Sequence, residues 1–200
     1  MADDAKNVEQ DIAAIFEEAA SVATELAAMD DLRAAVAEVA ALVIESIRAG
    51  GKVLLCGNGG SAADSQHIAA ELSGRFEMER RGLPAVALTT DTSALTSIGN
   101  DYGFEAVFRR QVEALGRGGD ILLVYSTSGN STNCLRAVEQ AGTMGVRTVA
   151  LTGRAGGALA EAADIALKAP SDVTARIQEC HGKIGHAICA VVERALCGDA

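Results

Sequence analysis

The 200-residue sequence predicts an α/β fold, a doubly wound parallel sheet of five strands flanked by helices. Short runs that are apolar at every position alternate with longer segments of helical periodicity, which is typical of strands covered on both faces. Loops rich in glycine, serine or threonine follow these runs. Ligands of such sheets bind beyond the carboxyl ends of the strands, so we expect these loops to border one crevice.

Two helices are predicted before the first strand. Residues 1–50 form this helical pair, which belongs to the same domain as the ligand-binding α/β part at 51–200. In the first helix, from about Asp3 to Met29, apolar residues recur at three- and four-residue steps. The second helix ends at Gly50, as helices often do at glycine. Because the first helix is far in sequence from any strand, we expect it to pack on a neighbouring subunit.

The rest of the chain alternates strand and helix. The predicted strands are Val53–Cys56, Ala85–Thr89, Ile121–Tyr125, Val146–Leu151 and Ile165–Ala169. The predicted helices are Ser61–Gly74, Glu105–Leu115, Ser131–Ala141, a short helix ending at Ala162, and a long final helix Val173–Leu196. A polar stretch from Thr92 to Asp101 intervenes between a strand and a helix and is assigned to neither.

Composition excludes several classes of partner. The net charge of −10, with no basic run, argues against a nucleic-acid surface and against anionic membranes. The five cysteines are odd in number and show no CxxC spacing, so they are predicted to be reduced in a cytoplasmic protein. The first ten residues, MADDAKNVEQ, are too polar for a signal peptide, and no apolar run is long enough to span a membrane.

The first candidate binding loop is Gly57-Asn58-Gly59-Gly60, between a predicted strand and a helix that begins at Ser61. Glycines let backbone N–H groups approach an anion, which the helix dipole also favours. GNGGSA matches the dinucleotide fingerprint G-x-G-x-x-A as well, but a lone match is weak. The loop is therefore interpreted as a phosphate or sugar cradle.

The second candidate loop is Ser126-Thr127-Ser128-Gly129-Asn130-Ser131. An ordinary strand-to-helix turn needs one serine or threonine and perhaps a glycine. This loop has more small polar residues than an ordinary turn of that kind needs. Its hydroxyl groups and backbone amides could hold a phosphate dianion without any lysine.

The three histidines lie on two predicted helices. His67 and Glu71 are one turn apart and share a face, while Gln178 and His186 lie toward one side of the last helix. Two imidazoles, a carboxylate and an amide oxygen could bind a divalent metal of the zinc type, although each histidine could instead satisfy an ordinary hydrogen bond. His181 points away from His186 and is interpreted as a structural residue behind the site.

Several motifs resemble one known family. They are CGNGGSAADSQHIAAELSGRF from Cys56, GNDYGF from Gly99, STSGNS from Ser126, LTGRAGG from Leu151 and ARIQECHGKIGH from Ala175. Together they resemble the sugar isomerase (SIS) domain, and more narrowly the phosphoheptose isomerase family, over essentially the whole chain. STSGNS marks only the broad superfamily. The GNGGS…H…E and RIQE…H motifs are specific to the narrower group.

The resemblance implies a single SIS domain that interconverts sedoheptulose 7-phosphate and D-glycero-D-manno-heptose 7-phosphate, an early step toward surface heptose and lipopolysaccharide. It implies one zinc ion per site and a homotetramer with sites at subunit interfaces. The implied substrate-binding residues are Asn58, Gly59, Ser61, Arg75, Asp101, Ser126, Thr127, Ser128, Ser131 and Gln178. The implied metal-binding residues are His67, Glu71, Gln178 and His186. Some relatives have aspartate where this chain has Ala175, so one secondary substrate contact differs.

The expected chemistry is proton transfer between C1 and C2 through an enediol(ate), with Glu71 as the base and His186 as its acid–base partner. One alternative is a non-catalytic protein of the type that associates with a replication initiator. Those relatives lack the catalytic glutamate and the histidine of the last helix, both of which are present here. The chain could also be an isomerase for a different phosphosugar, or a phosphosugar-sensing regulator.

Overall fold

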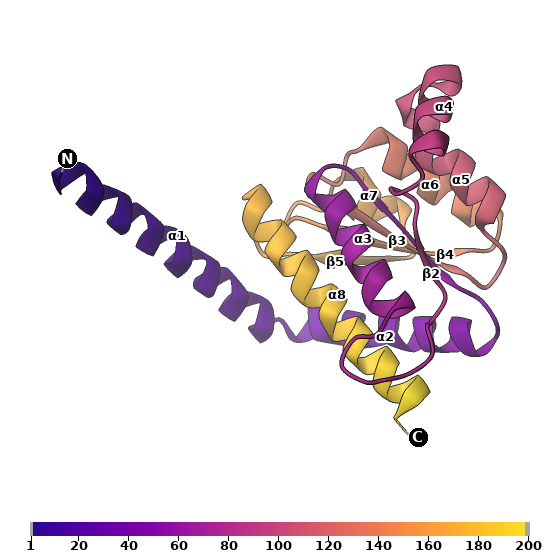
Figure 1. Cartoon of the computed structure of the whole chain (residues 1–200), viewed down its shortest axis with the longest axis horizontal. Coiled ribbons are helices and arrows are strands. Elements are labelled where there is room, and N and C mark those ends of the chain that lie inside the picture. The colour runs from indigo at the N-terminus through magenta and orange to yellow at the C-terminus, as the bar shows by residue number, and fades with distance from the viewer. Residues whose placement is uncertain (1, 199–200) are drawn as a thin grey trace.

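The computed structural model describes residues 2–198 and contains one parallel sheet in the order β2-β1-β3-β4-β5 (Figure 1). Its strands are β1 Val53–Gly57, β2 Ala85–Ala87, β3 Ile121–Ser126, β4 Arg147–Thr152 and β5 Ile165–Lys168. The doubly wound parallel sheet is confirmed, because the strand order reverses direction between β1 and β3. The predicted ligand loops follow these two strands, so both lie at the point where such sheets bind ligands.

Helices cover both faces of the sheet. Their bounds are α1 Ala2–Ala28, α2 Asp30–Arg48, α3 Gly60–Ser73, α4 Thr92–Tyr102, α5 Val107–Leu115, α6 Thr132–Thr143, α7 Gly157–Ala162 and α8 Thr174–Cys197, with a 3-10 turn at Phe104–Ala106. One face packs against α2, α3 and α8 around Val43, Ile68 and Ile188. The other packs against α5, α6 and α7 around Phe108 and Leu159.

The polar stretch that was assigned to no helix or strand forms the helix α4, which the sequence analysis missed. The Asp91 carboxylate accepts a hydrogen bond from the Ala94 backbone N–H, which caps the helix start. None of the residues of α4 is buried. Leu95 and Ile98 pack partly buried against the core, but this apolar stripe is too short to predict a helix by periodicity.

The start of α3 also differs from the expectation. The helix begins at Gly60, and Gly59 occupies the N-cap position with φ of +57°. Ser61 therefore lies inside the first turn, where it is buried rather than acting as a cap.

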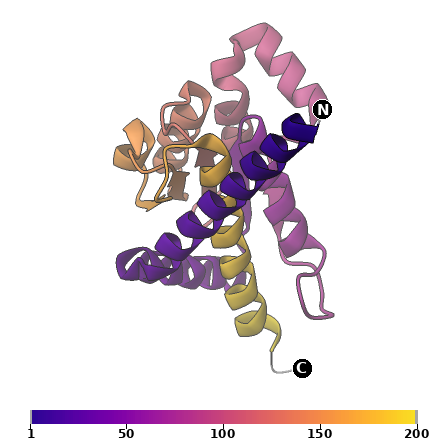
Figure 2. The same cartoon turned by 90° about the vertical axis from the view of Figure 1, so that its left-hand side faces the viewer.

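The first helix extends away from the body of the molecule (Figure 1), and it crosses α8 in the perpendicular view (Figure 2). It leaves four large apolar side chains in solvent: Val8, Ile12, Ile15 and Phe16, the last of them 69% exposed. Within residues 2–198, no helix is both long enough and apolar enough to cross a membrane.

Candidate functional site

The chain after β1 turns so tightly that side chains would not fit at two of its glycines, Gly57 and Gly60. A Cβ atom on Gly57 would lie 2.7 Å from the Ser61 carbonyl oxygen, and one on Gly60 would collide with the amide end of Gln178. Gly59 adopts a backbone conformation that favours glycine. The loop therefore brings α8, through Gln178, directly against the start of α3.

The serine loop after β3 is ordered by its own polar groups. The Ser126 and Ser131 hydroxyls are 3.1 Å apart, and the Ser128 hydroxyl accepts from the Asn130 backbone N–H at 3.2 Å. Ser131 occupies the N-cap position of α6, yet its hydroxyl makes no capping bond. The Ser126 and Ser131 hydroxyls therefore face each other at a helix start, where the unpaired backbone N–H groups favour an anion.

A reciprocal amide pair joins the two loops. Asn58 donates to the Asn133 side-chain oxygen at 2.9 Å, and Asn133 donates to the Asn58 side-chain oxygen at 2.8 Å. Asn133 is buried in the first turn of α6. The sequence analysis missed Asn133, although it lies just beyond the STSGNS motif. Its pairing fixes Asn58 relative to the serine loop.

The two loops border a cavity of about 200 Å³. The predicted residues that line it are Asn58, Ser61, Ser126, Thr127, Ser131 and Gln178, and two further residues, Tyr125 and Thr174, complete the wall. Thr174 directly precedes the ARIQECHGKIGH motif at the start of α8. No lysine or arginine is among the residues that line this cavity, so an anion there would be held by hydroxyls, amides and helix dipoles.

Further along α3 and α8, the side chains of His67 and Glu71 on α3 and of His186 on α8 converge. The His67 Nε2 atom lies 3.0 Å from Glu71 Oε1 and 3.2 Å from His186 Nε2. One potential ligand atom from each residue lies within 4.8 Å of the others. The side chains of His67 and Glu71 are 49% and 25% exposed, so the group is open to solvent.

This donor set fits a divalent metal of the zinc type. Two imidazoles and a carboxylate are common protein ligands of zinc, and two facing imidazole nitrogens share at most one proton, so at least one presents a lone pair. Gln178, the fourth predicted ligand, lies about two turns before His186 on α8 and packs against Gly60. Its part in metal binding stays a prediction.

Other predicted site residues lie apart from the cavity within one chain. Asp101 is exposed on α4 and accepts a hydrogen bond from the Asn100 side chain at 2.8 Å. Arg75 is exposed just after α3, and Ser128 is exposed in the serine loop. A single chain therefore does not bring Asp101 or Arg75 to the cavity wall.

His181, which the sequence analysis interpreted as a structural residue behind the site, is fully buried on α8. Its Nε2 atom lies 3.1 Å from the Thr152 carbonyl oxygen, to which it donates, and its ring packs edge-on against Tyr125. Burial lowers its pKa to about 4, against the opposing effect of the hydrogen bond to Thr152, so the ring is neutral at pH 7.

Asp64, one turn before His67 on α3, is a polar residue that the sequence analysis did not single out. Burial raises its pKa to about 6, and the nearby His67 imidazole lowers it by less. Its Oδ2 atom and the Tyr125 hydroxyl are buried and make no hydrogen bond within the described chain.

Comparison with known proteins identifies the family. The SIS domain family model matches residues 16–153. The phosphoheptose isomerase of Rhodospirillum rubrum is 55% identical over 169 residues, which are 84% of this chain and 90% of that protein. The structure of phosphoheptose isomerase from Neisseria gonorrhoeae matches with a TM-score of 0.88 at 46% identity, over 93% of this chain and 98% of that one. The structure of a phosphoheptose isomerase from Francisella tularensis matches with a TM-score of 0.87 at 44% identity, over 92% of this chain and 97% of that one. The chain therefore belongs to the phosphoheptose isomerase family of SIS-domain enzymes.

Proposed function

We propose that this chain interconverts sedoheptulose 7-phosphate and D-glycero-D-manno-heptose 7-phosphate. The observation that carries the proposal is the convergence of Glu71, His67 and His186 on helices that also border a lysine-free polar cavity. His67 follows Ser61 on α3 by roughly 9 Å of helix. Because Ser61 lines the cavity together with the serine loop, a phosphate bound at that loop and a carbonyl group beside His67 would be at opposite ends of one ligand.

The phosphate is proposed to bind the serine loop. The Ser126, Thr127, Ser128 and Ser131 hydroxyls and the amide groups at the start of α6 supply neutral donors for a dianion. The proposed sugar contacts come from Asn58, Gly59, Ser61 and Gln178, with Arg75 and Asp101 as further contacts. Because Asn58 is held by Asn133, and its amide nitrogen also lies 3.8 Å from Cys134 Sγ, the remaining lone pair of its side-chain oxygen points in a fixed direction.

Glu71 is the proposed base. It removes a proton from C1 of the ketose as the C1–C2 double bond forms, while His186 gives a proton to the C2 oxygen. Glu71 then returns its proton to C2, and the O1 hydroxyl gives its proton to His186, which yields the aldose. His67, Glu71, Gln178 and His186 are the residues proposed to hold one zinc ion, which when bound would polarise the sugar carbonyl.

The test is incubation of the purified protein with sedoheptulose 7-phosphate, with zinc or with a chelator, while the aldose product is followed by NMR. Glu71→Gln should lower kcat by about 10²–10⁴-fold, the usual contribution of a general base, while ligand binding measured by calorimetry survives. Glu139→Gln, on the exposed face of α6, is the isosteric control. Near-normal turnover by Glu71→Gln would refute the assignment. Turnover of a different ketose phosphate alone would instead assign another phosphosugar.

We also propose that residues 1–50 join four copies of the chain, with sites completed at the subunit interfaces. The exposed apolar residues of α1 support this proposal, as does an apolar hollow of about 320 Å³ where α1 meets α2 and α8. Phe16→Glu should dissociate the assembly in native mass spectrometry, whereas Leu115→Glu on α5 should not. A tetramer that survives Phe16→Glu would contradict this packing. A cytoplasmic location stays a prediction.

A further inference from the structure

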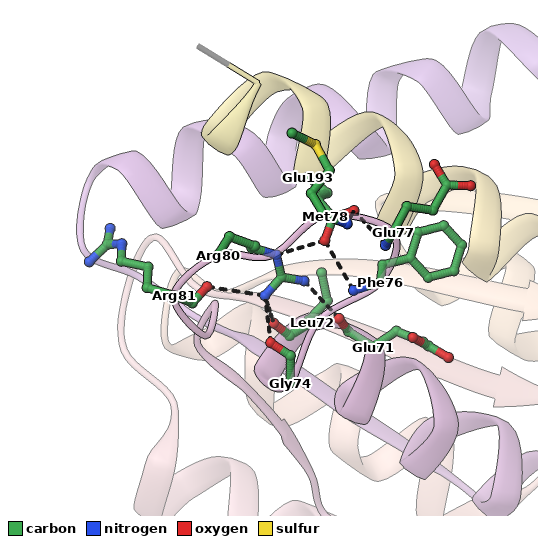
Figure 3. A network of polar contacts seen from close by, with 9 residues as sticks. All are labelled: Glu71, Leu72, Gly74, Phe76, Glu77, Met78, Arg80, Arg81 and Glu193. Carbon is green, nitrogen blue, oxygen red and sulfur yellow. Dashed lines mark hydrogen bonds and ion pairs between the residues drawn. The ribbon is translucent and has the colours of Figure 1, made fainter. Parts of the chain in front are cut away.

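A buried carboxylate organises the loop that connects α3 to β2. Glu193, near the end of α8, accepts hydrogen bonds from the backbone N–H groups of Phe76, Glu77 and Met78 at 3.0, 2.7 and 3.0 Å (Figure 3). It also pairs with Arg80 Nε at 2.8 Å, and the two side chains are only 1% and 3% exposed. Burial alone would raise the pKa of Glu193, but these four donors outweigh it and hold the pKa below its ordinary value.

Arg80 turns the other side of its guanidinium toward α3. Its Nη2 atom donates to the Glu71 carbonyl oxygen at 2.8 Å, and its Nη1 atom donates to the carbonyls of Leu72 and Gly74 at 2.8 and 2.9 Å (Figure 3). The last carbonyls of a helix have no partner within the helix, and a cation is favourable there. Arg80 therefore caps the C-terminus of α3, while Glu193 holds Arg80 from α8.

This network lies directly behind the proposed site. Glu71, whose carbonyl Arg80 binds, is in the last turn of α3, and His186 is about two turns before Glu193 on the same side of α8. Phe76, in the clamped loop, has its ring centroid 5.6 Å from that of His186. The loop thus contacts both helices that supply the metal-binding group.

We infer that Arg80 and Glu193 are positioning residues of the active site, which set the spacing between Glu71 on α3 and His186 on α8. Neither residue is placed to touch the substrate. The inference rests on the proposed isomerisation for its kinetic test, but its structural content concerns the metal-binding group itself. A displacement of the order of 1 Å between catalytic groups can lower a rate by roughly 10²-fold.

The simpler interpretation is that the pair only stabilises the fold, and the chain offers a matched control. Asp120 is also 3% exposed and pairs with Lys52 Nζ at 2.5 Å. It accepts from the backbone N–H groups of Lys52 and Arg117, both at 2.9 Å. This pair lies where β1 and β3 begin, at the opposite end of the strands from the ligand loops. Asp120→Asn therefore removes a comparable buried charge far from the site.

The experiment compares Glu193→Gln, Arg80→Lys and Asp120→Asn with the unaltered chain. We expect Glu193→Gln and Arg80→Lys to lower kcat by about 10²-fold with KM changed by less than about threefold, because the phosphate loops are untouched. Arg80→Lys keeps the charge but lacks the planar fork that reaches the α3 carbonyls, so it replaces Glu193→Gln if that variant fails to fold. Asp120→Asn should lower the unfolding temperature without this loss of kcat.

The second readout is metal binding, which does not depend on turnover. Cobalt(II) added to the metal-free protein gives a visible spectrum that reports ligand geometry. Glu193→Gln and Arg80→Lys should each alter this spectrum or weaken cobalt binding at least tenfold. If the unaltered chain fails to isomerise sedoheptulose 7-phosphate, the proposed function fails and the cobalt spectrum still decides the positioning role. Variants that keep both kcat and cobalt affinity within about threefold, while losing as much stability as Asp120→Asn, would overturn the inference.

Discussion

Gly185 lies where α8 crosses α3, and an alanine there should push the two helices apart. A Cβ atom at this position would lie 2.5 Å from Ile68 Cδ1 and 2.7 Å from Ile68 Cγ1, with the Tyr125 hydroxyl at 3.6 Å. Ordinary contact begins at 3.4 Å, so either Ile68 or α8 must move by about 1 Å. Ile68 is 1% exposed within the core and has little room to move.

The magnitude follows from a comparison with Gly182 in the same helix, where a Cβ atom would have no neighbour within 4 Å. Both substitutions gain about 1 kcal/mol of helix propensity, and only Gly185→Ala adds the overpacking cost of about 1–3 kcal/mol. Gly182→Ala should therefore be more stable than Gly185→Ala by about 1–3 kcal/mol, a difference of several degrees in Tm for a chain of this size.

Activity should separate the two variants further, because His186 follows Gly185 directly. Thermal unfolding followed by circular dichroism measures the stability difference, and kcat for sedoheptulose 7-phosphate measures the displacement of His186 from His67. We expect Gly185→Ala to lose on the order of 10²-fold in kcat and Gly182→Ala to keep it. Equal stability and equal kcat in the two variants would refute the reasoning about this helix crossing.

Two further predictions concern backbone conformation and pH. Gly129→Ala places a residue with a side chain in the left-handed region, at φ +66°, and pushes its Cβ atom against the Gly156 carbonyl. Urea unfolding should therefore show a loss of at least about 1–2 kcal/mol in the free energy of unfolding, and KM should rise. The control Gly142→Ala, in open space on α6, should leave the free energy of unfolding unchanged or increase it. Because the pKa of His181 is lowered from 6.5 to about 4, the unfolded chain binds more protons between those values and stability falls as pH is lowered from 6.5 toward 4. Between pH 7 and 4.5 this group should account for a loss of about 2 kcal/mol, which His181→Asn should abolish in urea titrations at the two pH values; an unchanged pH dependence would contradict the linkage.

The sheet could be predicted because its central strands, such as β1 and β3, are apolar runs that are buried throughout. The edge strands β2 and β5 are less buried, and they were predicted from their apolar sequence. The helix α4 could not be predicted, since none of its residues is buried and its apolar contact with the core comes from two partly buried residues, Leu95 and Ile98. The approach of His67 to Glu71 follows from helical spacing alone. The approach of His186 does not, because it depends on how closely α8 crosses α3 at Gly185.

The supporting contacts of the site were even less accessible to sequence reasoning. Asn133 and Asn58 are 75 residues apart, and Arg80 and Glu193 are 113 apart. No periodicity links such pairs, since each depends on the side-by-side placement of elements that only the folded chain provides. Charged and amide residues also occur on solvated faces, so their type alone does not mark them as buried partners.

The two reciprocal hydrogen bonds between the Asn58 and Asn133 side chains have a consequence for ligand affinity. Since each side chain satisfies the other, the loops after β1 and β3 move as one unit, and most of the entropy lost in ordering them is lost when the chain folds. An incoming sugar phosphate therefore meets a receptor whose shape is already set. Ligands that differ in the part bound by these two loops should therefore associate at similar rates and differ mainly in their dissociation rates.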